Sequence, residues 1–216
     1  MMTRTSLALT CSAAALIVLA ASSAGAQQDA RLALIRDDAT RDVVRAQLVS
    51  ASSRGLPADP FMSKALEGVA KKATSKSIRA AMAALEKRLR IASSALAPTP
   101  SVDELAAGAD ALSVGVPEKS LKQLRTAAPG RSIAVELGVL TELVARGVPA
   151  KQASKLVLDL VARGASGVQL TALGRDVQGD VAAGLKPDVA LDLRGRNVLS
   201  LLPPPPTVSN VNVRPR

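Results

Sequence analysis

The chain has 216 residues, a mass of 22.1 kDa and a formal net charge of +10, from 28 Lys and Arg against 18 Asp and Glu. It contains no His, Trp or Tyr, a single Phe and a single Cys. Without His, neither a Ser-His-Asp triad nor a His-ligated metal site can form. The composition therefore says more about excluded chemistries than about what the protein does.

The N-terminal segment 1–26 has the pattern of a secretory signal peptide. A short stretch with one positive charge, Arg4, precedes an apolar run from Leu7 to Ala21, and small residues follow as Ala24-Gly25-Ala26. This order predicts cleavage after Ala26. At about 15 residues the run is shorter than the ~20 that a spanning helix needs. We therefore expect an exported protein, periplasmic or extracellular, with no transmembrane segment after cleavage.

Cleavage would also remove Cys11, so the mature chain would have no disulfide and would depend on burial alone. Charged residues at 21% and apolar residues at 48% are typical of a globular chain. With one aromatic residue, Phe61, the core must come from Leu, Val, Ile and Ala. Phe61 and its neighbour Met62 are expected in that core and not in a membrane anchor.

Helical periodicity dominates, and alternating strand patterns are nearly absent. Ile78, Met82, Leu85 and Leu89 form one stripe at spacings of four, three and four residues. Similar stripes and cap residues predict an all-α fold with helices at 28–52, 60–72, 75–91, 102–113, 118–127, 132–145, 152–163 and 168–182, and a short one at 187–194.

The breaks between helices recur as Gly-apolar-Pro. Gly55-Leu56-Pro57, Gly115-Val116-Pro117 and Gly147-Val148-Pro149 share this form, and Gly184-Leu185-Lys186-Pro187 is a looser copy. Gly accepts the left-handed conformation that ends a helix, and Pro fits the first turn of the next. A second break follows each of the first three glycines, about one helix length further along the chain. In the third of these breaks, Ser166 is a natural N-cap of the next helix. Two architectures fit, a helical-hairpin array or an irregular helical bundle with similar caps.

Composition shifts divide the chain into five segments. The segment 92–101 is rich in Ala, Ser and Pro, which predicts a linker, and 197–216 contains Pro203–Pro206, which predicts a disordered Pro-rich tail. The predicted organisation is therefore a signal peptide 1–26, an N-terminal helical region 27–91 with a basic hairpin, a linker 92–101, a helical-hairpin region 102–196 and the tail 197–216.

The positive charge is concentrated on one predicted hairpin, 61–91. Such a face attracts anionic lipid or polysaccharide, although a solvated helix face is the simpler interpretation. Nucleic acid is not expected, because single-strand binders stack bases on aromatic side chains. The candidate anion-binding residues are Lys64, Lys71, Lys72, Lys76, Arg79, Lys87, Arg88 and Arg90.

No catalytic motif is present. A carboxylate pair for glycoside hydrolysis could come from Asp103 with Glu104 or from Asp176 with Asp180, but the chain lacks the aromatic platforms usual at sugar sites. No lysine has a serine three residues before it, and calcium and phosphate loops are absent. We expect no enzyme, no cofactor and no metal.

Three functions are compatible with this sequence. The first is an exported, non-catalytic scaffold that binds a still unidentified envelope protein through its stacked hairpins. The alternative is an envelope-associated binder of an anionic cell-surface polymer or lipid through the basic hairpin 61–91. A carboxylate-based cell-wall hydrolase is the weakest of the three.

Overall fold

The computed structural model describes residues 30–204, and within this range every regular element is a helix. The all-α prediction is confirmed. The predicted signal peptide and residues 205–216 of the predicted tail lie outside the described residues. The chain divides into two compact units at Ala83–Ala84, within helix α4, and each unit is described by itself. The helices are α2 (Asp38–Ser53), α3 (Ala58–Ala70), α4 (Ser75–Ala95), α5 (Val102–Ser113), α6 (Glu118–Ala127), α7 (Ala134–Ala145), α8 (Ala150–Ala162), α9 (Gly167–Ala182) and α10 (Pro187–Ser200).

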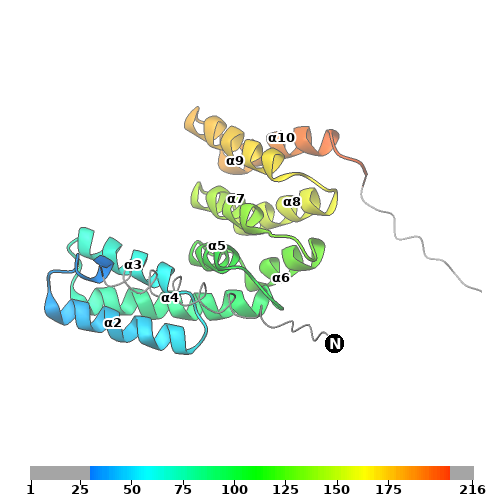
Figure 1. The fold of residues 1–216 in the computed structure, drawn as a ribbon. Coiled ribbons are helices and arrows are strands. Elements are labelled where there is room, and N and C mark those ends of the chain that lie inside the picture. The colour runs from blue at the N-terminus through cyan, green and yellow to red at the C-terminus, as the bar shows by residue number, and fades with distance from the viewer. Residues whose placement is uncertain (1–29, 205–216) are drawn as a thin grey trace, which may run out of the picture. The chain divides into compact units, whose positions relative to one another are not determined.

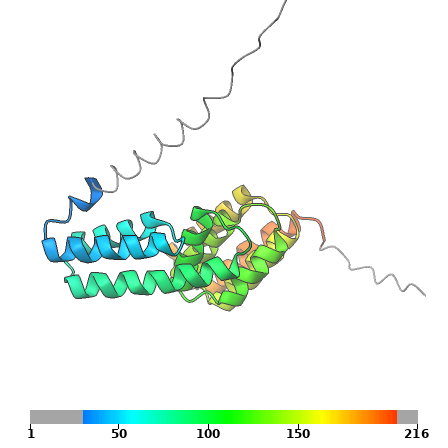
Figure 2. The same cartoon turned by 60° about the horizontal axis from the view of Figure 1, so that its bottom comes forward.

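The first unit contains α2, α3 and the first half of α4, which run side by side (Figures 1 and 2). Phe61 and Met62 of α3 are fully buried, as predicted. Val44 of α2 and Ile78 of α4 are buried as well, so each of the three helices contributes to the core of this unit.

A polar cluster joins the starts of α2 and α4. Asp37 caps α2 by accepting from the Thr40 backbone N–H at 2.7 Å, and the Thr40 hydroxyl lies 2.7 Å from that of Ser75. Because of this cap, α2 begins at Asp38, whereas the periodicity predicted one continuous helix over 28–52.

Two helices are longer than their patterns predicted. Helix α4 extends to Ala95, four residues into the predicted linker 92–101, because Ala92, Ala95 and Leu96 continue its buried stripe. Helix α10 extends to Ser200 instead of ending at 194, since Val198 and Leu199 remain half-buried. In both cases tertiary packing prolongs a helix whose local sequence suggested an end.

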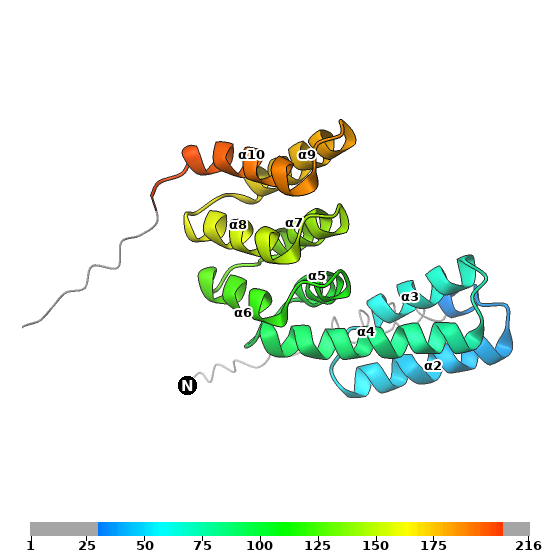
Figure 3. The same cartoon turned by 180° about the vertical axis from the view of Figure 1, so that it is seen from behind.

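The second unit is a stack of helical hairpins in two layers. Helix α5 packs on α7 and α7 on α9 in one layer, while α6 packs on α8 and α8 on α10 in the other (Figures 1 and 3). The helices of the first layer begin at nearly equal intervals along the chain, at Val102, Ala134 and Gly167. Of the two predicted architectures, the structure has the hairpin array.

The Gly-apolar-Pro segments join the two helices of each hairpin. Gly115 and Gly147 both have φ of +94°, and the next residue in each case donates its N–H to the carbonyl five residues earlier, Val116 to Ala111 and Val148 to Leu143. This is the Schellman C-cap, which favours a residue without a Cβ at its left-handed position. Val116 and Val148, the apolar residues of these segments, are both buried.

A buried carboxylate connects three helices of the array. Glu104, at the start of α5, accepts from the Ser101 N–H at 2.9 Å, from the Ile133 N–H at 3.0 Å and from Arg125 Nη1 of α6 at 2.8 Å. Ile133 is the N-cap of α7. Burial raises the pKa of the Glu104 carboxyl, but the Ser101 and Ile133 N–H groups and Arg125 outweigh it and hold that pKa below its usual value.

The two ends of the stack differ in character. At one end Gly108 of α5 lies against Ala92 of α4 and Leu96, leaving no room for a Cβ without displacing them. At the other end, the exposed Asp176 of α9 occupies the position that the buried Leu143 has in α7, one hairpin earlier. A polar outer face is what a terminal repeat needs to remain soluble.

Two glycine-to-alanine substitutions should change the free energy of unfolding in opposite directions. In Gly68→Ala the new Cβ would lie 2.7 Å from Cγ1 of the buried Ile78, so we expect a loss of about 1–3 kcal/mol in the free energy of unfolding. A Cβ added to Gly179 would have nothing within 4 Å, so Gly179→Ala should gain about 0.5–1 kcal/mol from helix propensity. Urea denaturation followed by circular dichroism measures both, and equal effects would contradict the packing of α3 on α4.

Removing the cation from the Glu104 cluster should be costly. Arg125→Met leaves a buried carboxylate without its charged partner, so we expect a loss of about 3 kcal/mol at pH 7. Lys122→Met is the matched control on the same helix, because it breaks only the exposed Lys122–Glu118 pair and should cost under about 1 kcal/mol. Equal losses in the two variants, measured by urea denaturation, would contradict the buried pair.

The effect of Arg125→Met should also depend on pH. A lowered pKa in the folded state gives stability that is present above the unfolded pKa, near 4.5, and is lost as the pH falls through the folded pKa. The variant lacks part of this contribution, so the difference between the two proteins should shrink below about pH 4.5. A difference that does not change with pH would contradict the assigned role of Glu104.

Candidate functional site

Five of the predicted anion-binding residues belong to the first unit, and two of them are already paired. Lys64 and Lys71 each lie 2.6 Å from the Glu67 carboxylate, on the same side of α3. Hydrogen bonds from Lys64 and then Lys71 lower the pKa of Glu67 to about 2. Glu67 therefore neutralises part of the positive charge that the sequence concentrates here.

The other three cations of this unit lie around the turn between α3 and α4. Lys72, Lys76 and Arg79 are exposed, and no ion pair joins them to another residue of the described range. Lys72 has φ of +55° at the end of α3. We name Lys72, Lys76 and Arg79 the basic turn, because it is the part of the predicted site that is open to an anion.

The three remaining residues, all on the second half of α4, differ in accessibility. Lys87 is exposed, and Arg90 is exposed with its Nη1 3.8 Å from Glu86 Oε1. Arg88 is half-buried, and its Nε is buried with no hydrogen-bond partner in the described part of the chain. The eight cations therefore do not form one uniform surface.

Of the four carboxylates considered for hydrolysis, Glu104 and Asp180 bind structural partners, whereas Asp103 and Asp176 are exposed. Glu104 holds the hairpin array together, while its neighbour Asp103 is exposed. Asp180 of α9 accepts two hydrogen bonds from Arg194 of α10, at 2.6 and 2.7 Å, which lower the pKa of its carboxyl. Asp176, one turn earlier, is exposed. The lowered pKa values of Glu104 and Asp180 are the opposite of what the acid of a glycosidase requires.

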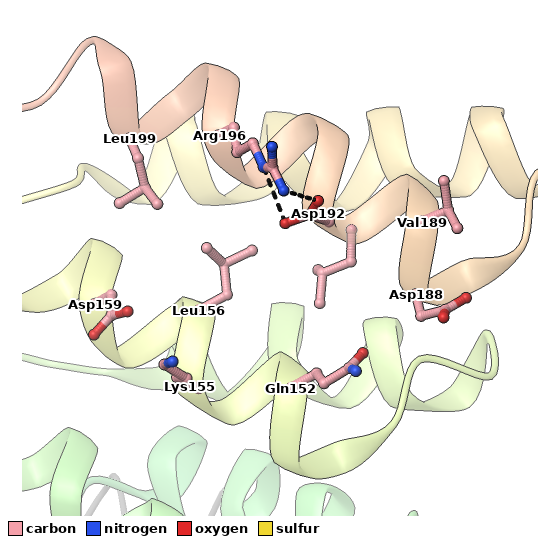
Figure 4. Close-up of a pocket in the computed structure, with 10 residues that line it drawn as sticks. Gln152, Lys155, Leu156, Asp159, Asp188, Val189, Asp192, Arg196 and Leu199 are labelled. Carbon is pink, nitrogen blue, oxygen red and sulfur yellow. Dashed lines mark hydrogen bonds and ion pairs between the residues drawn. The ribbon is translucent and has the colours of Figure 1, made fainter.

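The second unit contains a groove that sequence analysis did not predict. It lies between α8 and α10, has a volume of about 470 Å³ and is shown in Figure 4. Apolar and charged side chains both line it: Gln152, Lys155, Leu156 and Asp159 from α8, and Asp188, Val189, Leu191, Asp192, Arg196 and Leu199 from α10. Its size is within the range of ligand and peptide pockets.

A glycine lets α10 lie close to Leu156, a residue that lines the groove. A Cβ on Gly195 of α10 would lie 2.6 Å from Cδ2 of Leu156, so a larger residue would displace that side chain. Leu156 points from α8 towards α10 (Figure 4). The sequence signal for this contact was Gly195 itself, because a glycine within a helix often marks close packing.

The rim of the groove carries charges of both signs. Arg196 forms two hydrogen bonds with Asp192 one turn away on α10, at 3.2 and 2.6 Å (Figure 4). Asp159 and Asp188 have no hydrogen bond or ion pair from their side chains to any other described residue. An apolar floor with unpaired carboxylates at its edge can accept an apolar side chain next to a positive charge.

Comparisons of the chain with protein-family models, curated proteins and solved structures find no match. Within residues 30–204, no group of three or more acidic, Cys or His side chains is arranged to hold a metal ion. Over the same residues no helix combines the length and apolar character needed to cross a membrane.

The charge balance at Glu67 can be tested by titration. We expect NMR to give a pKa near 2 for the Glu67 carboxyl, and Lys64→Met to raise it, because Lys64 is its strongest hydrogen-bond donor. Lys87→Met, a substitution of an exposed lysine elsewhere on the chain, is the control and should leave the value unchanged. A Glu67 pKa near its ordinary 4.5 in the parent protein would contradict the pairing.

Proposed function

We propose that the protein is an exported, non-catalytic helical-repeat scaffold that binds a segment of an envelope protein in the groove between α8 and α10. The observation that carries this proposal is the groove itself, an apolar floor bordered by charge within a rigid stack of hairpins. Stacked helical repeats provide extended binding surfaces of this type. Export rests on the signal-peptide pattern of residues 1–26.

The lining residues indicate the chemistry of the bound segment. Leu156, Val189 and Leu199 offer apolar surface, whose burial contributes about 25 cal/mol per Å². Asp159 and Asp188 favour a Lys or Arg beside the apolar anchor, and they disfavour an acidic neighbour. The favoured ligand is therefore a peptide segment with one or two apolar side chains flanked by a basic residue.

The carboxylates support a binding role over catalysis. The pKa of Glu104 and that of Asp180 are both lowered, so these groups stay ionised at neutral pH and cannot act as general acids there. Each is also occupied by structural hydrogen bonds to Arg125 or Arg194. The functional chemistry that we propose is recognition.

A second candidate function is supported by the basic turn. Lys72, Lys76 and Arg79 present three exposed cations with no acidic partner in the described range. Such a surface would hold an anionic lipid or polysaccharide in a salt-dependent manner. This binding would add to the groove interaction and would not replace it.

The groove proposal predicts a difference between two matched substitutions on α10. Val189 lines the groove and is 50% exposed, whereas Leu193, one turn later, is 47% exposed and does not line it. Val189→Asp should reduce capture of an envelope protein from extract by at least about tenfold, because a bound apolar anchor would meet a buried charge. Leu193→Asp should leave capture unchanged. If both variants lost capture equally, or if neither lost it, the groove would not be the binding site.

The basic turn makes a separate prediction. Changing Lys72, Lys76 and Arg79 together to Gln should abolish binding to vesicles that contain anionic lipid at roughly 50 mM salt, where screening is weak. Changing Lys119, Lys122 and Lys151 to Gln removes equal charge from elsewhere and should leave the binding intact. Retention of the basic-turn variant on the vesicles would exclude this second function.

A further inference from the structure

The two unpaired carboxylates of the groove lie at its opposite ends. Helices α8 and α10 run in the same direction along the groove, so Asp188 lies where the two helices begin and Asp159 lies where they end (Figure 4). Gln152 lines the Asp188 end, and Leu199 lines the Asp159 end. The surroundings of each carboxylate decide which end favours a bound cation.

The Asp188 end is unfavourable for a cation. Asp188 is in the first turn of α10, where the free backbone N–H groups carry partial positive charge, and its carboxylate offsets that charge. Lys151 at the start of α8 and Lys186, the N-cap of α10, are exposed, and neither forms an ion pair within the described residues. Asp188 therefore has a role in its own helix, and two lysines near this end repel a basic side chain.

The Asp159 end has the opposite character. Asp159 is in the last turn of α8, whose free carbonyl groups carry partial negative charge. The last turns of α8 and α10 contain no basic residue. A cation bound at this end would be attracted by Asp159 and by the ends of both helices.

Three cations lie near Asp159, and none of them is paired with it. Arg196 is already held by two hydrogen bonds to Asp192. Lys155 lies one turn before Asp159 on α8, and no ion pair joins the two side chains (Figure 4). Arg163, the C-cap of α8, is half-buried, does not line the groove and forms no ion pair within the described part of the chain. The Asp159 carboxylate is therefore available to a ligand, with Lys155 as the competing cation in the lining.

Apolar side chains near Asp159 suit the stem of a basic residue. Leu156, three residues before Asp159, and Leu199 line this part of the groove, and both are half-buried. Lys and Arg place their methylene stems along such a surface while the charged end stays in water. We propose that Asp159, and not Asp188, selects a basic side chain in the bound segment, an inference that rests on the groove function proposed above.

A peptide selection with matched variants tests this assignment. From a random peptide library displayed on phage, the full chain should enrich peptides that carry Lys or Arg next to an apolar residue. Asp159→Asn should remove the enrichment of Lys and Arg, because the attracting charge is gone. Asp188→Asn is the control at the other end and should retain the enrichment. The proposal is overturned if Asp188→Asn removes the enrichment, or if Asp159→Asn retains it.

A synthetic peptide from this selection gives the effect a magnitude. Replacing its basic residue by Met should weaken binding to the parent chain about fivefold, as expected for an ion pair at a partly exposed site, and should leave binding to the Asp159→Asn variant unchanged. Lys155→Met removes the competing cation and should strengthen binding of the basic peptide. Isothermal titration calorimetry measures all of these affinities. A fivefold loss that persists in the Asp159→Asn variant would show that the basic residue contacts another group.

Val189→Asp separates this inference from the groove function. If that variant recovers the same peptides as the parent chain, the peptides bind elsewhere and both proposals fail. If it loses the peptides but Asp159→Asn leaves their basic residue enriched, the groove function stands and only the role of Asp159 is wrong. A selection by the parent chain that enriches no basic residue would likewise overturn the role of Asp159 alone, provided that Val189→Asp loses the selected peptides.

Discussion

The stack of hairpins depends on one buried carboxylate. The Glu104 carboxylate accepts hydrogen bonds from the N–H groups of Ser101 and Ile133, at the starts of α5 and α7, and forms an ion pair with Arg125 of α6. Three helices therefore contact one side chain. A buried charge is stable only when it is fully partnered, and this requirement ties the starts of α5 and α7 to the last turn of α6. Helix α7 packs against α8 and α9, and α10 packs against both of these helices. The position of the groove between α8 and α10 therefore depends on the same cluster.

Much of the fold could be predicted from the sequence, for identifiable reasons. The stripe from Ile78 to Leu89 and the Gly-apolar-Pro segments are local signals. The structure buries the stripe and gives these glycines the predicted left-handed conformation, while the prolines lie at the N-cap, one position before the first turn. The predicted ends of α4 and α10 were wrong by four and six residues, because tertiary packing of Ala95 and Leu199 prolongs both helices. The structural role of Glu104 was not predicted. Its partners Arg125 and Ile133 are distant in the sequence, and no local pattern links the three residues.

The candidate sites were less predictable than the fold. Counting charges located the basic residues but could not show that Glu67 pairs with Lys64 and Lys71. Because of this pairing, the basic turn is the part of the predicted site that remains accessible to an anion. Beside the groove, Leu156 of α8 closely approaches Gly195 of α10. A glycine within a helix is a local signal of close packing, but it does not identify Leu156 as the partner, because the whole of α9 separates the two residues in the sequence. The groove places apolar side chains beside charges, and the proposed binding function rests on this combination.

The most direct test of the proposed function is NMR shift mapping of the chain with a protein that it retains from envelope extract. If the groove is the binding site, the largest amide shifts should occur in α8 and α10, at Gln152, Asp188 and Val189. Shift changes confined to the basic turn, or spread evenly over the surface, would contradict a binding site in the groove.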